Sequence, residues 1–127
     1  MTNVNPHKAT GLRRLVNALG YSLSGFLFAW HDESAFRQEV VFAIVLVPLA
    51  FMMPVTVTQQ VLLVASVILV LIVEMINSAI ETIIDRISLD IHSLSKRAKD
   101  MGSAAVLLAL MNAIVTWIVI LWSVFNL

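Results

Sequence analysis

The stretch VEMINSAIETIIDR, residues 73–86, decides the fold, because it places acidic side chains at the end of an uncharged run from 40 to 73. A helix through it carries Glu74, Asn77 and Glu81 on nearly the same face, since steps of three and four residues each amount to roughly one turn. An ionised side chain at the centre of a bilayer costs at least about 2.5–3.5 kcal/mol. Two glutamates on one face of a membrane helix therefore point to function. The purely structural alternative is that they pair with basic groups or reach the membrane surface.

The composition indicates a membrane protein of one domain, residues 1–127. Hydrophobic residues make up 60% of the chain and charged residues 13%, whereas soluble domains carry about a quarter charged residues. Eight basic and eight acidic residues cancel, so nothing favours a nucleic acid as a partner. The absence of cysteine excludes disulfides and thiolate metal sites. The first 30 residues lack an uninterrupted apolar core and a small-residue cleavage site, so we expect no removable signal peptide.

An amphipathic helix is predicted over about 11–31. Apolar residues recur at three- and four-residue steps from Leu12 to Trp30, while Arg13 and Arg14 fall largely on the other side. This pattern is typical of a helix that lies at a membrane surface. An ordinary helix that faces a protein core is the alternative interpretation.

Three membrane spans follow, because about 20 apolar residues suffice to cross the hydrocarbon layer. The spans are predicted at about 34–53, 60–85 and 101–125. The uncharged residues 54–60 predict a turn. The basic segment 86–99 predicts a second surface helix or an extension of the second span.

The distribution of basic residues predicts the topology. Every Lys and Arg lies within residues 8–37 or 86–99. By the positive-inside rule, the N-terminus and the 86–100 segment lie in the cytoplasm, whereas the 54–60 turn and the C-terminus lie outside. Three spans satisfy this alternation, so the predicted protein is a multi-pass membrane protein.

In this topology the unusual polar groups meet at the cytoplasmic interface. Glu81 and Asp85 lie just before Arg86, whereas Glu74 lies about 10 Å deeper at a rise of about 1.5 Å per residue. A site at this depth can take one substrate from water and another from lipid. Glu74, poorly solvated, suits a general base that acts on a lipid hydroxyl.

Carboxylates from two separate elements suit Mg²⁺, which keeps water and phosphate oxygens at its other positions. Glu81 with Glu33 or Glu39 could supply them. Lys99 and Arg14 could neutralise phosphate oxygens, although contact with lipid headgroups is the plainer interpretation of basic residues near a membrane. No glycine pattern of a nucleotide-binding loop occurs in the sequence.

Three ungapped motifs resemble sequences of the prokaryotic diacylglycerol kinase family. Members of this family are small integral-membrane kinases. They are ESAFRQE at 33–39, VEMINSAIE at 73–81 followed by Asp85 and Arg86, and AKDMGSAA at 98–105. The resemblance covers nearly all of residues 11–125. It implies an all-α fold with a surface helix and three spans, assembled as a homotrimer with shared active sites in the bacterial cytoplasmic (inner) membrane. It also implies Mg²⁺-dependent transfer of the ATP γ-phosphoryl group to diacylglycerol, giving phosphatidic acid.

The resemblance also implies roles for individual residues. Glu74 resembles the base, and Asn77 resembles a residue that supports the site. Glu33 and Glu81 resemble the Mg²⁺ ligands. The residues that resemble nucleotide contacts are Arg14, Tyr21, Glu33, Glu81, Asp90, His92, Lys99 and Asp100. Those that resemble lipid-substrate contacts are Arg14, Glu74, Ser103 and Trp117.

Three other functions remain open at this point. A polyprenol (undecaprenol) kinase of the same family has the same helical spacing. A small proton-coupled transporter would use Glu74 as its proton carrier, but such an acid is expected near the bilayer midplane. A non-catalytic assembly subunit would need none of the acids.

Overall fold

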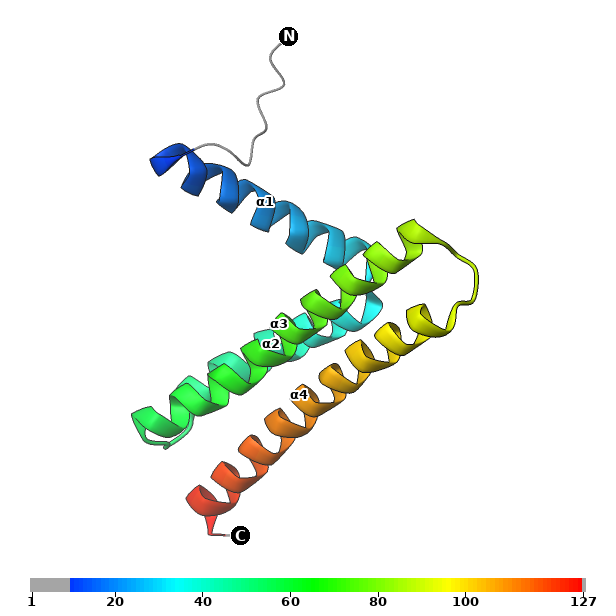
Figure 1. Ribbon diagram of the computed structural model, residues 1–127. Helices are drawn as coiled ribbons and strands as arrows, with labels where there is room; N and C mark the ends of the chain where they lie inside the picture. The colour runs from blue at the N-terminus through cyan, green and yellow to red at the C-terminus, as the bar shows by residue number, and fades with distance from the viewer. Residues whose placement is uncertain (1–9, 127) are drawn as a thin grey trace. The chain divides into compact units, whose positions relative to one another are not determined.

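The computed structural model describes residues 10–126, and these residues form four helices and no strand. The helices are α1 (Gly11–Asp32), α2 (Ser34–Met52), α3 (Val57–Ile87) and α4 (Ser93–Phe125) (Figure 1). Helices α2, α3 and α4 are long and apolar enough to cross a membrane. The predicted all-α fold with three apolar spans is therefore confirmed, whereas the location of α1 at a membrane surface stays a prediction.

The chain divides into two compact units, with the boundary after Ser34. The first unit contains α1, which continues to Asp32 and ends where the Glu33 N–H donates a hydrogen bond of 2.9 Å to the Ala29 carbonyl. The second unit, Ala35–Leu127, contains the rest of α2 and all of α3 and α4. The N-terminal segment 1–9, for which a cytoplasmic location is predicted, lies outside the described residues.

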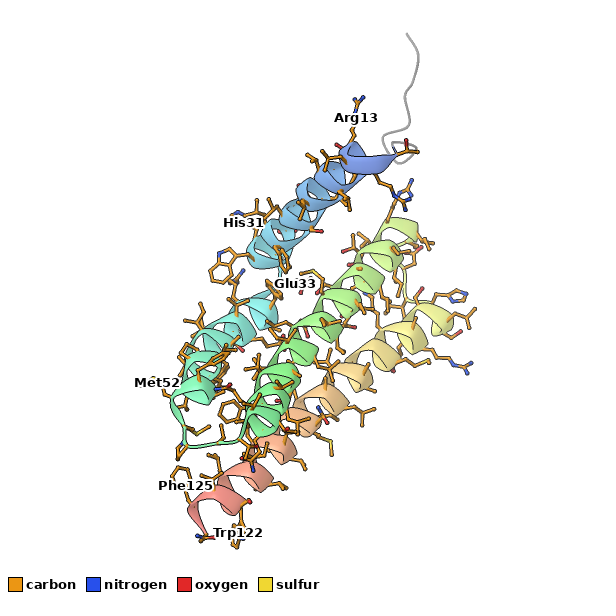
Figure 2. The ribbon with its side chains drawn as sticks, turned by 90° about the vertical axis from the view of Figure 1, so that its left-hand side faces the viewer. Arg13, His31, Glu33, Met52, Trp122 and Phe125 are labelled. Atoms are coloured by element: carbon orange, nitrogen blue, oxygen red, sulfur yellow. The ribbon has the colours of Figure 1, made fainter. Side chains whose placement is uncertain are left out.

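In the second unit, α2 and α4 pack along α3 around an apolar core. The core side chains come from all three helices: Ala43, Ala50, Leu63, Val67, Trp117 and Ile120. The backbones that approach each other closely are those of α3 and α4, and α4 contributes the buried small residues Gly102 and Ala109, the residue type that lets helices associate closely in lipid. The three helices alternate in direction, so the C-terminal ends of α2 and α4, at Met52 and Phe125, lie at the same end of the unit (Figure 2).

The turn between α2 and α3 is shorter than predicted. The sequence predicts a turn over 54–60, whereas α3 begins at Val57. The cause is a capping box: Thr56 Oγ1 accepts from the Gln59 N–H at 3.2 Å, and Gln59 Oε1 accepts from the Thr56 N–H at 2.9 Å. Gln60 Nε2 donates to the Ala50 carbonyl at 3.4 Å, which ties the start of α3 to α2.

The basic segment 86–99 forms neither a separate surface helix nor an extension of α3, so that prediction is wrong. Residues 88–92 are non-helical, and α4 begins at Ser93 and continues without a break to Phe125. His92 marks the start, because its Nδ1 accepts from the Leu94 N–H at 3.1 Å. Lys96, Arg97 and Lys99 therefore lie on the first turns of the third apolar helix.

We expect Thr56→Ala to lower the free energy of unfolding by about 1 kcal/mol, because it removes the hydroxyl that caps α3. Thermal unfolding in detergent micelles would measure the change. Thr58→Ala, an exposed position in the first turn of the same helix, is the matched control and should change stability little. Equal stability of the two variants would contradict a capping role.

Candidate functional site

The polar row of α3, formed by Glu74, Asn77, Glu81 and Asp85, passes from buried to exposed along the helix. Glu74 is 5% exposed and Asn77 8%, Glu81 is half-buried, and Asp85 is exposed. The four residues lie on one unbroken helix, so the predicted common face is present. Burial within the protein increases away from the α3–α4 turn, whereas the depth of these residues in a membrane stays a prediction.

Asn77 and Glu81 are joined within this row. Asn77 Nδ2 donates to Glu81 Oε1 at 3.3 Å. The other end of the amide, Oδ1, is buried and accepts no hydrogen bond within the chain. The Asn77 amide therefore binds one carboxylate oxygen of Glu81 and leaves the other carboxylate oxygen, Oε2, without a bond from this amide.

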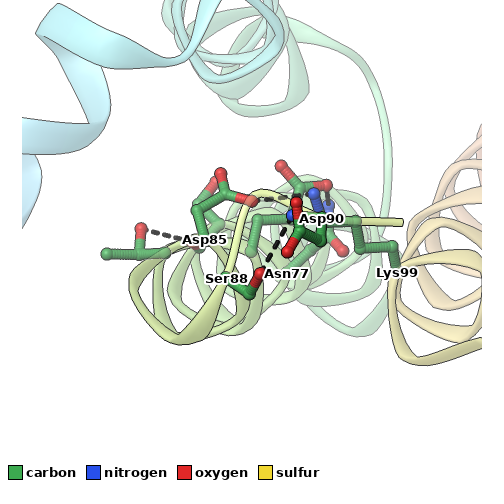
Figure 3. Close-up of polar contacts among 8 residues, drawn as sticks. Asn77, Asp85, Ser88, Asp90 and Lys99 are labelled. Carbon is green, nitrogen blue, oxygen red and sulfur yellow. Dashed lines mark hydrogen bonds and ion pairs between the residues drawn. The ribbon is translucent and has the colours of Figure 1, made fainter. Parts of the chain in front are cut away.

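An ion pair joins α3 to α4 at the exposed end of the row. Lys99 Nζ lies 2.8 Å from Asp85 Oδ1, as Figure 3 shows. About half of each side chain is exposed, so water screens the pair and it adds little to stability. A second pair joins Lys96 to Asp100 at 2.6 Å within α4. Lys99 and Asp100, both predicted as nucleotide contacts, are thus held in charged pairs.

A polar hollow opens where α3 turns into α4. Its volume is about 320 Å³. Its polar lining consists of Asp85, Ser88, Asp90, His92, Ser95, Lys96, Lys99 and Asp100. Four of the predicted nucleotide contacts, Asp90, His92, Lys99 and Asp100, are therefore brought together at one place. The Ser88 hydroxyl shapes the turn by accepting from the Asp90 N–H at 3.0 Å.

An apolar groove lies between the spans of the second unit. It has a volume of about 430 Å³ and is lined by α2, α3 and α4, including Glu39, Phe42, Val70, Ile114 and Trp117. Two residues of its lining each have a buried polar atom, Glu39 Oε2 and Trp117 Nε1, without a hydrogen-bond partner in the chain. The groove suits a largely apolar ligand with few polar groups.

The position of Glu39 near Glu74 could not be predicted from the sequence. Glu39 lies close enough to Glu74 for the two carboxylates to interact electrostatically. The sequence suggests Glu39 only as an alternative metal ligand. Helical periodicity orders residues within α2 or within α3 but does not set the register between the two helices, which is why this pairing could not be derived.

The predicted metal ligands come from different units. Glu33 follows α1 in the first unit, together with the predicted contacts Arg14 and Tyr21, whereas Glu81 belongs to the second. Within residues 10–126 no group of three or more His, Asp and Glu side chains could hold a metal ion. Glu81 itself fits Mg²⁺, a cation that prefers carboxylate oxygens and needs only one or two of them beside water and phosphate.

The predicted lipid contacts spread along α4. Ser103 is exposed one turn beyond Lys99, and Trp117 lines the apolar groove. Ser103 and Trp117 are about 21 Å apart along the helix axis at about 1.5 Å per residue. The structure thus separates a polar end from an apolar groove, with the polar row of α3 between them.

Comparison with known proteins gives consistent matches. The family model for prokaryotic diacylglycerol kinase matches residues 20–121. A diacylglycerol kinase of Escherichia coli (strain K12) is 50% identical over 120 residues, covering 94% of this chain and 98% of that protein. A diacylglycerol kinase of Pseudomonas aeruginosa is 54% identical over 112 residues, covering 88% and 91%. A diacylglycerol kinase of Helicobacter pylori is 42% identical over 112 residues and 88% of each chain.

The matched region contains all of α2 and α3, the polar hollow and the apolar groove. The relatives are matched over nearly their whole length rather than over one shared segment. The resemblance seen in the three sequence motifs is confirmed. The chain therefore belongs to the prokaryotic diacylglycerol kinase family.

Proposed function

We propose that this chain phosphorylates diacylglycerol with ATP, giving phosphatidic acid at the cytoplasmic face of a bacterial inner membrane. One observation carries the proposal. Asp85 belongs both to the polar row of α3 and to the lining of the polar hollow. From there the row continues along α3 to Glu74, which is buried among the spans. Such a row lets a water-soluble donor meet a lipid acceptor at one boundary. The names of the relatives support diacylglycerol as the acceptor.

The polar hollow is the proposed nucleotide site. Lys96, Lys99 and His92 place basic groups beside three aspartates there. A nucleotide phosphate could share the Lys99 ammonium, which the Asp85 carboxylate already holds in place. Phosphoryl transfer depends mainly on positioning and on neutralising phosphate charge, and a held ammonium serves both. Arg14 and Tyr21 of α1 are proposed as further contacts.

Glu74 is the proposed general base. It is buried, so few waters compete for its carboxylate, and it lies close enough to Glu39, a residue of the groove lining, for the two carboxylates to interact. In the proposed reaction, a Glu74 oxygen accepts the proton of the lipid hydroxyl as the hydroxyl oxygen attacks the γ-phosphorus of ATP. The bond between that phosphorus and the β,γ-bridging oxygen breaks, and ADP leaves. Ser103 and Trp117 are proposed to contact the lipid, with its acyl chains along the apolar groove.

Glu81 and Glu33 are the proposed Mg²⁺ ligands, and the ion would neutralise phosphate charge when bound. Asn77 orients Glu81 through the hydrogen bond to its Oε1. We also propose, as the resemblance to the family implies, a homotrimer in which active sites are shared between neighbouring copies.

A polar side chain in α4 supports self-association. Asn112 is exposed and lies about 20 Å from both Lys99 and Phe125 along the helix, which is the middle of the span. It lies on the face of α4 opposite Leu110 and Ile114, which line the groove with α2. An amide that faces hydrocarbon forfeits its hydrogen bonds, so this face favours contact with another helix.

The proposed activity is tested by incubating the purified protein in detergent with ATP, Mg²⁺ and either diacylglycerol or undecaprenol. We expect phosphatidic acid from the first lipid and far less product from the second. Robust activity on undecaprenol alone would overturn the assignment of the acceptor. Detergent leaves no sealed compartment, so phosphorylation there also distinguishes a kinase from a transporter.

We expect Glu74→Gln to lower kcat by about 10²–10⁴-fold, because it removes proton transfer while preserving side-chain shape. Kinase assays with saturating diacylglycerol would measure kcat, and light scattering would show that the oligomer is unchanged. Thr82→Val, an exposed position on the same helix, is the control. Full activity of the glutamine variant would refute the role of Glu74.

We expect Glu81→Ala to raise the Mg²⁺ concentration for half-maximal activity by about 10-fold or more, since a metal-site carboxylate is lost. A titration of activity against MgCl₂ at fixed total ATP would measure this. An unchanged titration curve would count against Mg²⁺ ligation by Glu81.

A further inference from the structure

Gly102 occupies the point where α4 meets Asn77 of α3. It is buried, and a Cβ added there would overlap the amide oxygen Oδ1 of Asn77. The next nearest atoms are Cγ of the same residue at 3.2 Å and its Cβ at 3.9 Å. At Gly11, Gly20 and Gly25, a Cβ would meet nothing within 4 Å. Among the four glycines, only Gly102 has its missing side chain replaced by a neighbouring residue, and that residue is one amide.

The contact decides how the Asn77 amide is turned. The last torsion of an asparagine side chain is soft, so the amide needs an external contact to hold one orientation. Here Oδ1 lies against Gly102, in a buried place without a hydrogen-bond donor, while Nδ2 points to Glu81 Oε1 at 3.3 Å. The backbone of α4 at Gly102 therefore forms the wall behind the amide, and Glu81 lies in front of it.

We propose that Gly102 is a positioning residue for the reaction. By having no side chain, it admits the Asn77 amide between α3 and α4, and the amide in turn holds the Glu81 carboxylate in the orientation that binds metal. The inference rests on the proposed role of Glu81 in Mg²⁺ binding. Partners that orient a metal ligand commonly change metal affinity or activity by about 10–100-fold when they are removed.

Close packing of helices alone does not explain this glycine. Small residues usually let two backbones approach, yet all three atoms nearest to the added Cβ belong to the Asn77 side chain rather than to the backbone of α3. An alanine at 102 can be accommodated by turning the end of that flexible side chain away. Gly102→Ala should therefore keep the helices together while it disturbs Glu81.

The test is a double-mutant cycle of Gly102→Ala and Asn77→Ala, in which Mg²⁺ titrations of kinase activity are measured in detergent. We expect each single variant to raise the half-maximal Mg²⁺ concentration by about 10–100-fold. The double variant should be no worse than Asn77→Ala alone, because both changes break one contact. Gly25→Ala on α1, where the new methyl group meets nothing, is the matched control and should behave as the parent protein.

Thermal unfolding of the same four variants and the parent provides a second readout. If Gly102→Ala is destabilised, Asn77→Ala in the same chain should restore its stability, because the methyl group then fills the space that the amide leaves. Three outcomes would each overturn the proposal. In the first, the increases in half-maximal Mg²⁺ concentration caused by the two single variants multiply in the double variant. In the others, Gly102→Ala leaves the Mg²⁺ titration curve unchanged, or Asn77→Ala fails to restore the stability of a destabilised Gly102→Ala variant. Glu81→Ala separates the role of Gly102 from the proposed role of Glu81 in Mg²⁺ binding. If only the Glu81→Ala variant leaves the Mg²⁺ titration unchanged, Glu81 is not the ligand. The cycle then still measures whether Gly102 acts through Asn77.

Discussion

A carboxylate that is buried among membrane spans is costly unless protein groups surround it, because hydrocarbon offers it no hydrogen bonds. The rest of this structure depends on that constraint. The α3 helix meets it by turning its polar row toward other protein elements. Glu74 is buried among the helices, Asn77 lies against α4 at Gly102, and Asp85 pairs with Lys99. The same three helices form the core and line the site. The packing of α2 and α4 on α3 therefore also determines where the acidic side chains lie.

Much of this could be predicted because the relevant signals are periodic or local. The spans follow from the length of the apolar runs, and the common face of Glu74 and Glu81 follows from helical spacing. The start of α3 was also readable, since Thr56 and Gln59 form a capping box of recognisable spacing. The predicted turn over 54–60 overlaps the first turn of α3, because an uncharged segment suits a turn and a helix equally and only the capping pair marks where the helix begins.

The remaining features depend on register between helices, which periodicity does not contain. Nothing in the spacing of α2 indicates that Glu39 comes close to Glu74. Nothing in the spacing of α4 indicates that Gly102 lies against Asn77 rather than one turn away. The prediction for the basic segment 86–99 is wrong for a related reason. Its apolar residues repeat as they would in a surface helix, and the decisive feature, that α4 runs unbroken from Ser93, concerns continuity rather than amphipathicity.

That continuity makes α4 a stiff rod with no hinge between its two ends. Lys99 at the polar hollow and Trp117 in the apolar groove are about 27 Å apart along a single helix. Without a proline or a break between them, α4 holds the polar hollow and the apolar groove at a fixed spacing. An insertion or a deletion between these two residues would change both that spacing and the face of the helix on which each side chain lies.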